Sequence, residues 1–264
     1  MDLKLKGKTV FVSGSTSGIG FGVAKQFLRE GAKVYINGRT QDSVRHAVSQ
    51  LLQIIPQADI EGFSADFSNT DDIQQLIEQL PVVDILINNV GIYSSKTFWE
   101  TTDEDWYRHI EVNVMSGVRL ARHYLPSMLS KNWGRIIFVS SECATLVPED
   151  LIAYSTTKTS LLALSRGLAQ LTTGTGVTVN AVLPGSTMTE GAAQFLAQLA
   201  TKQGKTTEKA ELDFFQQARP NSILSRFASV EDIANTIVYY ASPLSVATNG
   251  ASIKLDGGSM GGII

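Results

Sequence analysis

The chain has 264 residues, of which 43% are hydrophobic and 18% are charged, and its net charge at pH 7 is −3. This size suits one large α/β domain or two small ones, and the slightly acidic balance argues against a nucleic-acid partner. The single cysteine, Cys143, excludes an internal disulfide framework and a cysteine-based metal cluster, and we expect no metal. The chain shows no signal-peptide core and no apolar run near the ~20 residues of a membrane span, so we expect a cytoplasmic protein without a membrane partner.

The first predicted unit is a strand, a glycine-rich turn and a helix. A β-rich run at residues 9–13 is followed by a helical pattern over residues 21–30. Between them lie Gly14, Ser15, Thr16, Ser17, Gly18, Ile19 and Gly20. Glycines let a backbone approach a pyrophosphate closely, and the helix N-terminus offers free N–H groups to phosphate. The spacing G-x-x-x-G-x-G therefore predicts a dinucleotide site, and the alternative is a tight turn that binds nothing.

The second predicted strand, at residues 34–37, is followed by Gly38 and Arg39. In an NAD site, an acidic residue near this position binds the ribose 2′-hydroxyl. A guanidinium instead suits the 2′-phosphate of NADP, by its charge and by its planar fork of donors. We therefore expect NADP(H) rather than NAD(H), and the alternative is that Arg39 is an ordinary solvated loop residue.

An acidic residue follows the third predicted strand. The strand at residues 60–65 ends at Asp66 and Phe67. Because ligands of such sheets bind outside the carboxyl ends of the strands, Asp66 is a candidate to hold an adenine amino group. It is also placed to cap the helix that starts near Thr70. Both roles stay open at this point.

Two asparagines follow the fourth predicted strand, at residues 83–87. That strand is too apolar to face water on either side, so we expect it inside the sheet. It runs into Asn88, Asn89, Val90 and Gly91. Two amides and a glycine at a strand's carboxyl end either stabilise a turn or touch a ligand in the crevice.

A long helical region is predicted from about residue 103 to residue 129. Asn113 lies inside it, between two valines. An asparagine on an apolar helix face costs stability unless its amide is paired. Asn113 therefore belongs either to a functional polar network or to a satisfied structural contact.

A tyrosine and a lysine share one face of the next predicted helix. The fifth predicted strand, at residues 135–139, ends near Ser141. The helix after it runs to about residue 171 and carries Tyr154 and Lys158, which are four residues apart and so one turn from each other. A nearby ammonium favours the phenolate, so we expect the pKa of Tyr154 to be lowered towards neutral pH. A phenol with such a pKa is able to exchange a proton with a substrate oxygen.

The remaining elements complete an alternating pattern. A sixth strand at residues 177–183 is closed by Pro184 and Gly185, a helix follows at residues 230–241, and a seventh strand lies at residues 252–255. Strands alternate with helices throughout, which predicts an α/β fold with a doubly wound parallel sheet and helices on both faces. With no linker or internal repeat, we read residues 1–264 as one domain.

The segment from about residue 186 to residue 221 is longer than an ordinary connection between a strand and a helix. We call it the lid segment and predict two helices in it, at residues 190–201 and 208–218. We expect it to close over a substrate and exclude water. The alternative for most of its apolar residues is that they pack the segment onto the body. Its lysines either meet an acidic carrier or form a solvated face.

Taken together, these motifs resemble those of the short-chain dehydrogenase/reductase family, in particular its 3-oxoacyl-[acyl-carrier-protein] reductase-like members. The resemblance covers nearly the whole chain and its motifs come in the family's order. They are residues 13–20, Asp66, residues 88–91, Asn113, Ser141, Tyr154 with Lys158, and residues 184–189. Two positions depart from the family pattern: Ser13 stands for a threonine and Val90 for an alanine.

The resemblance implies a Rossmann-type fold and a role for each matching residue. Tyr154 would be the general acid or base, and Lys158 would lower its pKa and bind the nicotinamide ribose. Ser141 would polarise the substrate carbonyl, and Asn113 would hold a water that links Lys158 to solvent. Further cofactor contacts would come from Asp66 and Phe67, from Asn89, Val90 and Gly91, and from Pro184, Gly185, Thr187 and Thr189.

The implied function is an NADP(H)-dependent hydride transfer between the nicotinamide and a carbonyl or secondary alcohol carbon of a small-molecule substrate. The alternative is a catalytically weak NADP(H)-sensing or scaffold protein on the same fold, since fold does not imply function. The resemblance also implies a homodimer or homotetramer, with the apolar tail at residues 260–264 at an interface. Acyl thioesters, sugars, steroids and small ketones remain open as substrates.

Overall fold

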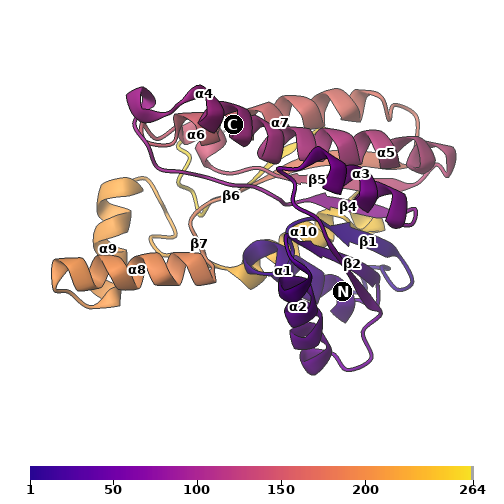
Figure 1. Ribbon diagram of the computed structural model, residues 1–264, viewed down its shortest axis with the longest axis horizontal. Helices are drawn as coiled ribbons and strands as arrows, with labels where there is room; N and C mark the ends of the chain where they lie inside the picture. Colours follow the sequence, from indigo (N-terminus) through magenta and orange to yellow (C-terminus); the bar gives the residue numbers. More distant parts are fainter. Residues whose placement is uncertain (263–264) are drawn as a thin grey trace.

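A parallel seven-stranded sheet forms the centre of the computed structural model, which describes residues 1–262 (Figure 1). The order across the sheet is β3-β2-β1-β4-β5-β6-β9. The strands are β1 (Thr9–Val12), β2 (Lys33–Gly38), β3 (Ile60–Ser64), β4 (Ile85–Asn88), β5 (Gly134–Val139), β6 (Val177–Pro184) and β9 (Ser252–Leu255). Each lies where a strand is predicted, and the doubly wound α/β fold is confirmed.

Helices cover both faces of the sheet. One face carries α1 (Gly18–Arg29), α2 (Gln41–Ile54) and α10 (Val230–Tyr240), and the other carries α3 (Thr70–Gln79), α5 (Ser116–Ser130) and α7 (Ile152–Gln170). Two separate hydrophobic cores fill the spaces between the helices and the sheet, one around Phe27 and Ile237 and one around Leu120 and Phe138. Burial on both faces explains why the central strands are continuous apolar runs without alternation.

The long helical region predicted over residues 103–129 is interrupted. It consists of α4 (Asp103–Ile110), a π-helical turn η2 (Glu111–Met115) and then α5. Asn113 lies in this wider turn, where the Ser116 backbone N–H donates to the Glu111 carbonyl, five residues back. The π-helical turn is absent from the prediction because it depends on contacts that Asn113 makes outside its own helix, and π-bulges of this kind are frequent at functional sites.

The lid segment stands at one side of the sheet as a pair of helices, α8 (Glu190–Gln203) and α9 (Thr207–Ala218) (Figure 1). Both are predicted, but the two short strands at their base, β7 (Thr187–Met188) and β8 (Ala228–Ser229), are not. The helices share a small core of Leu196, Phe215 and Phe227. This core packs the two helices against each other and against Phe227, whereas the alternative expected from the sequence is that such residues pack the segment onto the body.

Several short elements connect the others. They are η1 (Phe98–Glu100), α6 (Cys143–Leu146) and η3 (Pro243–Ser245). Within the apolar tail, Met260 packs against Ala144 and Leu183 of the same chain, and Ile263 and Ile264 lie outside the described residues. No helix in residues 1–262 is long and apolar enough to cross a bilayer.

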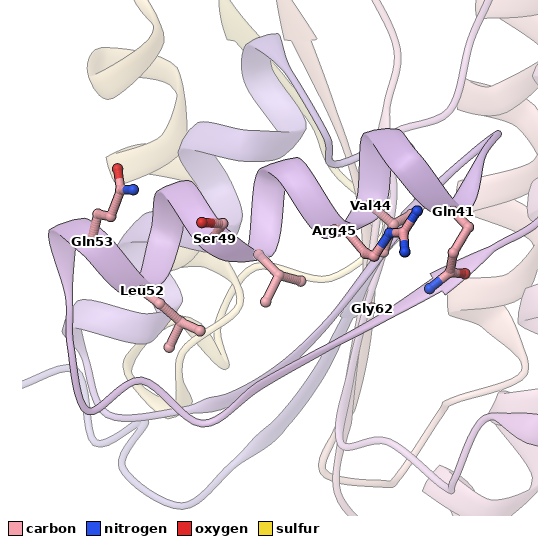
Figure 2. A pocket seen from close by; sticks show the side chains of 8 residues that line it. Gln41, Val44, Arg45, Ser49, Leu52, Gln53 and Gly62 are labelled. Atoms are coloured by element: carbon pink, nitrogen blue, oxygen red, sulfur yellow. The ribbon is translucent and has the colours of Figure 1, made fainter.

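One hollow lies away from the carboxyl ends of the strands, along the outer side of α2. Its lining comes from α2 and from Gly62 of β3, and includes Val44, Arg45 and Leu52 (Figure 2). It holds one guanidinium and no carboxylate, and none of its lining residues is a predicted site residue. The residues predicted to bind a cofactor instead follow the carboxyl ends of the strands, where ligands of such sheets bind.

Gly20, in the first turn of α1, has no room for a side chain. A Cβ at Gly20 would lie 2.5 Å from the Asn89 side chain and 2.5 Å from the Gly14 carbonyl oxygen. We expect Gly20→Ala to lower the free energy of unfolding by about 1–3 kcal/mol, the usual cost of overpacking. Urea denaturation followed by circular dichroism measures it.

Gly167, inside α7, provides the matched control, because a Cβ there meets nothing within 4 Å. We expect Gly167→Ala to stabilise the protein by up to about 1 kcal/mol through helix propensity. Equal effects of the two substitutions would show that the crowding at Gly20 is not real.

Candidate functional site

A crevice opens where the strand order reverses, between β1 and β4. Ligands of open α/β sheets bind at such a point, outside the carboxyl ends of the strands. Here the Ser13 hydroxyl accepts from the backbone N–H groups of Asn89 and Val90, at 3.0 and 3.2 Å. The Asn89 side chain donates to the carbonyls of Ser13 and Gly14, at 3.1 and 2.8 Å. Asn89 therefore stabilises the turn, which is one of its two predicted roles.

The glycine-rich turn leads from β1 into α1. Gly14 and Gly18 both adopt positive φ angles, 60° and 56°, which side-chain-bearing residues rarely adopt. Ser15 is fully buried, and its hydroxyl donates to the Val12 carbonyl at 2.6 Å and accepts from the Asn37 N–H. The side chain of Ser15 thus builds the turn and does not face the crevice, so a cofactor contact of Ser15 would have to come from its backbone.

A cavity of about 310 Å³ occupies the crevice beside this turn. Nine of its lining residues are predicted contacts: Gly14, Thr16, Ser17, Arg39, Asp66, Phe67, Asn89, Val90 and Gly91. The others, which include Asn37, Ile92, Arg108 and Val112, are absent from the prediction. Arg108 and Val112 approach from α4 and η2, and nothing in their local sequence distinguishes them from ordinary helix residues. Three-dimensional proximity alone identifies them.

Two arginines, Arg39 and Arg108, place positive charge on the wall of the cavity. Arg39 is exposed at the end of β2 and forms no ion pair within residues 1–262. Hydrogen bonds from Ser68 hold the pKa of Asp66 below its ordinary value, and the charges of Arg39 and Arg108 act in the same direction. The Asp66 carboxylate accepts from the Ser68 N–H at 2.9 Å and from the Ser68 hydroxyl at 2.8 Å.

The predicted alternative role of Asp66, as the cap of the next helix, is wrong. Asn69 is the N-cap of α3, and its side chain accepts from the Asp71 N–H at 2.9 Å. Asp66 lies three residues earlier and folds back onto Ser68. Its carboxylate thereby remains on the wall of the cavity.

Ser141, Tyr154 and Lys158 lie at the other end of the crevice. Lys158 is buried, and its Nζ donates to the carbonyl oxygen of Val139, the last residue of β5, at 2.9 Å. A Cβ placed on Gly91 would lie 3.1 Å from this Nζ, so the ammonium borders the wall of the cavity. The Tyr154 ring packs edge-on against the ring of Tyr93, with centroids 6.1 Å apart. Lys158 thus borders the cavity, and Tyr154, whose phenol hydrogen-bonds to Ser141, lies one helical turn before it.

The expected direction of the Tyr154 shift is wrong for the free protein. Burial raises the pKa of the Tyr154 phenol above its ordinary value, and hydrogen bonding to Ser141 offsets only part of that rise. Burial also lowers the pKa of the Lys158 ammonium to about 8. Both shifts share one cause, since removal from water disfavours the charged form of each group. The effect of the ammonium on the phenol is smaller than this desolvation.

The Asn113 amide is fully engaged with protein groups. Its Oδ1 accepts from the Ile92 N–H at 2.7 Å, and its Nδ2 donates to the Ile92 carbonyl and to the Thr157 hydroxyl, each at 2.9 Å. Thr157 precedes Lys158 on α7. The side chain of Asn113 is therefore a satisfied structural contact that ties the cavity wall to the helix carrying Lys158.

The predicted contacts after β6 lie where the lid segment begins. Gly185 has no room for a side chain, because a Cβ there would lie 2.7 Å from the Asp256 Cα. The Thr187 hydroxyl donates to the Gly185 carbonyl, and Thr189 caps α8 by accepting from the Ala192 N–H. Glu190 accepts from the Gly18 N–H at 3.1 Å, so a carboxylate of the lid segment meets the N-terminus of α1.

Cys143 is a buried free thiol whose backbone N–H donates to the Ser141 hydroxyl at 3.1 Å. Burial raises the pKa of the thiol, which keeps it protonated and chemically inert at neutral pH. Its contribution is structural, because the bond to Ser141 helps to orient that hydroxyl.

A family model described as short chain dehydrogenase matches residues 8–200, which include the glycine-rich turn, Asn113, Ser141, Tyr154 and Lys158. The chain belongs to the short-chain dehydrogenase family. The matched residues cover both ends of the crevice and all of the sheet except β9.

Individual relatives match along nearly the full length. The chain is 46% identical over 261 residues to the uncharacterized oxidoreductase YvrD of Bacillus subtilis, covering 98% of each chain. It is 29% identical over 262 residues to a 3-oxoacyl-[acyl-carrier-protein] reductase of Aquifex aeolicus, covering 98% and 99%. Among solved structures, L-sorbose reductase from Gluconobacter frateurii, complexed with NADPH and L-sorbose, superposes with a TM-score of 0.92 at 28% identity and full coverage of both chains.

Proposed function

We propose that this protein is an NADP(H)-dependent oxidoreductase that transfers a hydride between the nicotinamide and a carbonyl or secondary alcohol carbon. The observation that carries the proposal is the position of Ser141, Tyr154 and Lys158 around one end of a crevice whose other end is an electropositive cavity. A dinucleotide bound along such a crevice would present its nicotinamide to these three side chains.

The residues of the crevice fit this cofactor. The free N–H groups at the N-terminus of α1 suit a pyrophosphate, and binding there would replace the Glu190 carboxylate that now accepts from Gly18. Arg39 is available for a 2′-phosphate, and Asp66 faces the same cavity for an adenine amino group. The Arg39 guanidinium at the cavity and the NADPH complex of L-sorbose reductase both favour NADP(H).

The protein's own contribution to the reaction is proton transfer and orientation. When bound, the nicotinamide supplies or accepts the hydride. Tyr154, which is a neutral phenol in the free protein, donates its proton to the substrate oxygen as negative charge develops there. The Ser141 hydroxyl donates a second hydrogen bond to the same oxygen. The Lys158 ammonium, anchored on Val139, stabilises the phenolate left on Tyr154.

Tyr154→Phe tests the proposed proton donor. It removes the phenol oxygen and leaves the ring in place, so we expect carbonyl reduction to fall by at least about 100-fold, the usual range for a lost general acid. NADPH binding, measured by fluorescence, should persist. Tyr93→Phe is the matched control, because the Tyr93 ring packs against Tyr154 but its side chain is exposed, and we expect near-normal rates. If the Tyr154→Phe protein keeps more than about a tenth of the rate, the mechanism must be abandoned.

Arg39→Asp tests the proposed cofactor preference. A carboxylate repels a 2′-phosphate and accepts from a 2′-hydroxyl, so the NADPH/NADH affinity ratio should fall about 10- to 100-fold. Arg45→Asp is the control, because Arg45 is an exposed arginine on the neighbouring helix α2 whose ion pair is with Asp42. Isothermal titration with both nucleotides gives the ratio. An unchanged ratio for Arg39→Asp would refute the assignment to the 2′-phosphate.

The pH dependence of reduction follows from Lys158. Because its pKa is lowered to about 8, the ammonium is present below that pH and is lost as the pH rises through it. Tyr154, with a raised pKa, keeps its proton over the same range. We expect kcat/KM for NADPH, which reports the free enzyme, to be level at neutral pH and to fall by about tenfold per pH unit above ~8. Thermal unfolding at each pH controls for denaturation, and a level profile to pH ~9.5 would contradict the role of Lys158.

A further inference from the structure

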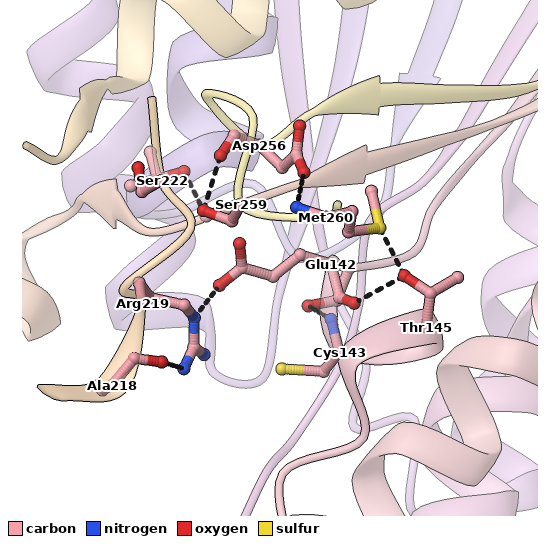
Figure 3. Close-up of polar contacts among 12 residues, drawn as sticks. Glu142, Cys143, Thr145, Ala218, Arg219, Ser222, Asp256, Ser259 and Met260 are labelled. Atoms are coloured by element: carbon pink, nitrogen blue, oxygen red, sulfur yellow. Dashed lines mark hydrogen bonds and ion pairs between the residues drawn. The ribbon is translucent and has the colours of Figure 1, made fainter. Parts of the chain in front are cut away.

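A buried carboxylate follows Ser141 directly in the chain. Glu142 is 2% exposed, and its backbone N–H donates to the Pro184 carbonyl at 2.8 Å. Its Oε1 accepts from Nε of Arg219 at 2.5 Å (Figure 3). Nothing in the proposed proton transfer uses this carboxylate, yet burying a charge is costly unless it is paired. Arg219 supplies the partner that this burial requires, so the pair links the residue after Ser141 to a second segment of the chain.

The partner, Arg219, is the last residue of the helical part of the lid segment. It is the C-cap of α9, and its Nη1 donates to the Ala218 carbonyl at the end of that helix. Its guanidinium lies 5.9 Å from the ring centroid of Phe214, which belongs to the apolar contacts between α8 and α9. The guanidinium is thus fixed to the lid segment on one side and to Glu142 on the other.

The Glu142–Arg219 pair differs from the other ion pairs of the lid segment. Lys205 and Lys209 both pair with Asp213, so those bonds stay within the segment, and both lysine side chains are exposed by more than a third. The Glu142 and Arg219 side chains are only 3% and 15% exposed. Among the ion pairs within residues 1–262, this one alone joins the lid segment to the body.

A third segment meets the pair from the C-terminal side. A Cβ on Gly185 would lie 2.8 Å from Oε2 of Glu142 and 2.7 Å from the Asp256 Cα, so these three residues pack without spare space. The Leu224 N–H donates to the Gly257 carbonyl at 2.8 Å, which fixes the chain leaving the lid segment to the loop after β9. Figure 3 shows Glu142 between Arg219 and the loop that contains Asp256 and Ser259.

We propose that Glu142 and Arg219 are positioning residues, and that their ion pair holds the lid segment in register with Ser141 during turnover. Because Glu142 adjoins Ser141, a displacement of the lid segment is transmitted to the serine hydroxyl, and a displacement of ~1 Å can cost about 100-fold in rate. The proposal rests on the oxidoreductase function for its catalytic consequence, but the attachment of the lid segment is independent of that function.

The test compares Glu142→Gln, Arg219→Gln and the double variant with the wild type. Asp213→Asn is the matched control, because it breaks the ion pairs inside the lid segment and leaves the bond to the body. Hydrogen exchange of the whole protein without substrate reports directly how firmly the lid segment is held to the body. We expect faster exchange over residues 190–218 in the Glu142 and Arg219 variants. Asp213→Asn should produce no comparable change over the same residues.

Steady-state kinetics give the catalytic consequence. We expect kcat for carbonyl reduction to fall about 10- to 100-fold in each single variant. NADPH affinity should change by less than about threefold, because neither Glu142 nor Arg219 lines the cavity proposed for the adenosine. The double variant should lose no more than the worse single variant, since both substitutions remove one interaction. Glu142→Asp, which retains the charge, should recover part of kcat.

The outcomes separate this inference from the proposed function. Unchanged exchange in Glu142→Gln would overturn the attachment, whatever the activity. Faster exchange with normal kcat would overturn the positioning role and leave a merely structural pair. A wild-type protein that reduces no carbonyl would contradict the proposed function, and the exchange data would still decide whether the pair holds the lid segment. Additive losses in the double variant would show that the two residues act separately.

Discussion

The hydrogen bonds that join the ends of β1 and β4 hold the rest of the candidate site in place. Asn89 donates twice to Ser13, from its backbone N–H to the hydroxyl and from its side-chain amide to the carbonyl, across the point where the strand order reverses. These bonds keep the glycine-rich turn and the turn after β4 at a fixed separation. The crevice forms because the chain runs from β1 towards one edge of the sheet and from β4 towards the other. The crowding at Gly20 follows from the same contacts, since Asn89 occupies the space that a side chain there would need.

Burial sets the electrostatic state of Tyr154 and Lys158, the two groups proposed to take part in proton transfer. In the free protein the pKa values of Tyr154 and Lys158 are shifted in opposite directions, raised for the phenol and lowered for the ammonium, because desolvation disfavours the charged form of each group. A phenol that keeps its proton suits the reduction direction, in which the protein must donate. The Lys158 ammonium bonds to the carbonyl of Val139, the last residue of β5, and Ser141 follows two residues later. The end of β5 therefore holds both Lys158 and Ser141 in place.

The sequence predicts those features that depend on local pattern. The strands appear as apolar runs, the glycine-rich turn as a spacing, and the relation of Tyr154 to Lys158 as one helical turn. Features that require residues distant in the chain to meet are not predictable in this way. The π-helical turn depends on Asn113 reaching Ile92 and Thr157, and the strand pair β7–β8 joins residues about forty apart.

The same reasoning applies to individual residues. Arg108 reads as a surface helix residue until the fold brings α4 over the cavity, and Glu142 reads as a loop residue until α9 brings Arg219 to it. Ser15 fits the pattern of a binding turn, yet its hydroxyl is consumed inside the turn. The pKa of Tyr154 depends on the depth of burial, which a spacing of four residues does not give. The expected homodimer or homotetramer stays a prediction.

The most direct test of the central claim is the oxidation of NADPH and NADH by the pure protein, measured in parallel across a panel of carbonyl compounds. The panel should contain a 3-oxoacyl thioester, a keto-sugar, a steroid ketone and small diketones. We expect turnover with at least one class, faster with NADPH than with NADH. Binding of NADPH with no turnover of any class would contradict the proposed hydride transfer, and turnover with NADH alone would contradict the assignment of Arg39.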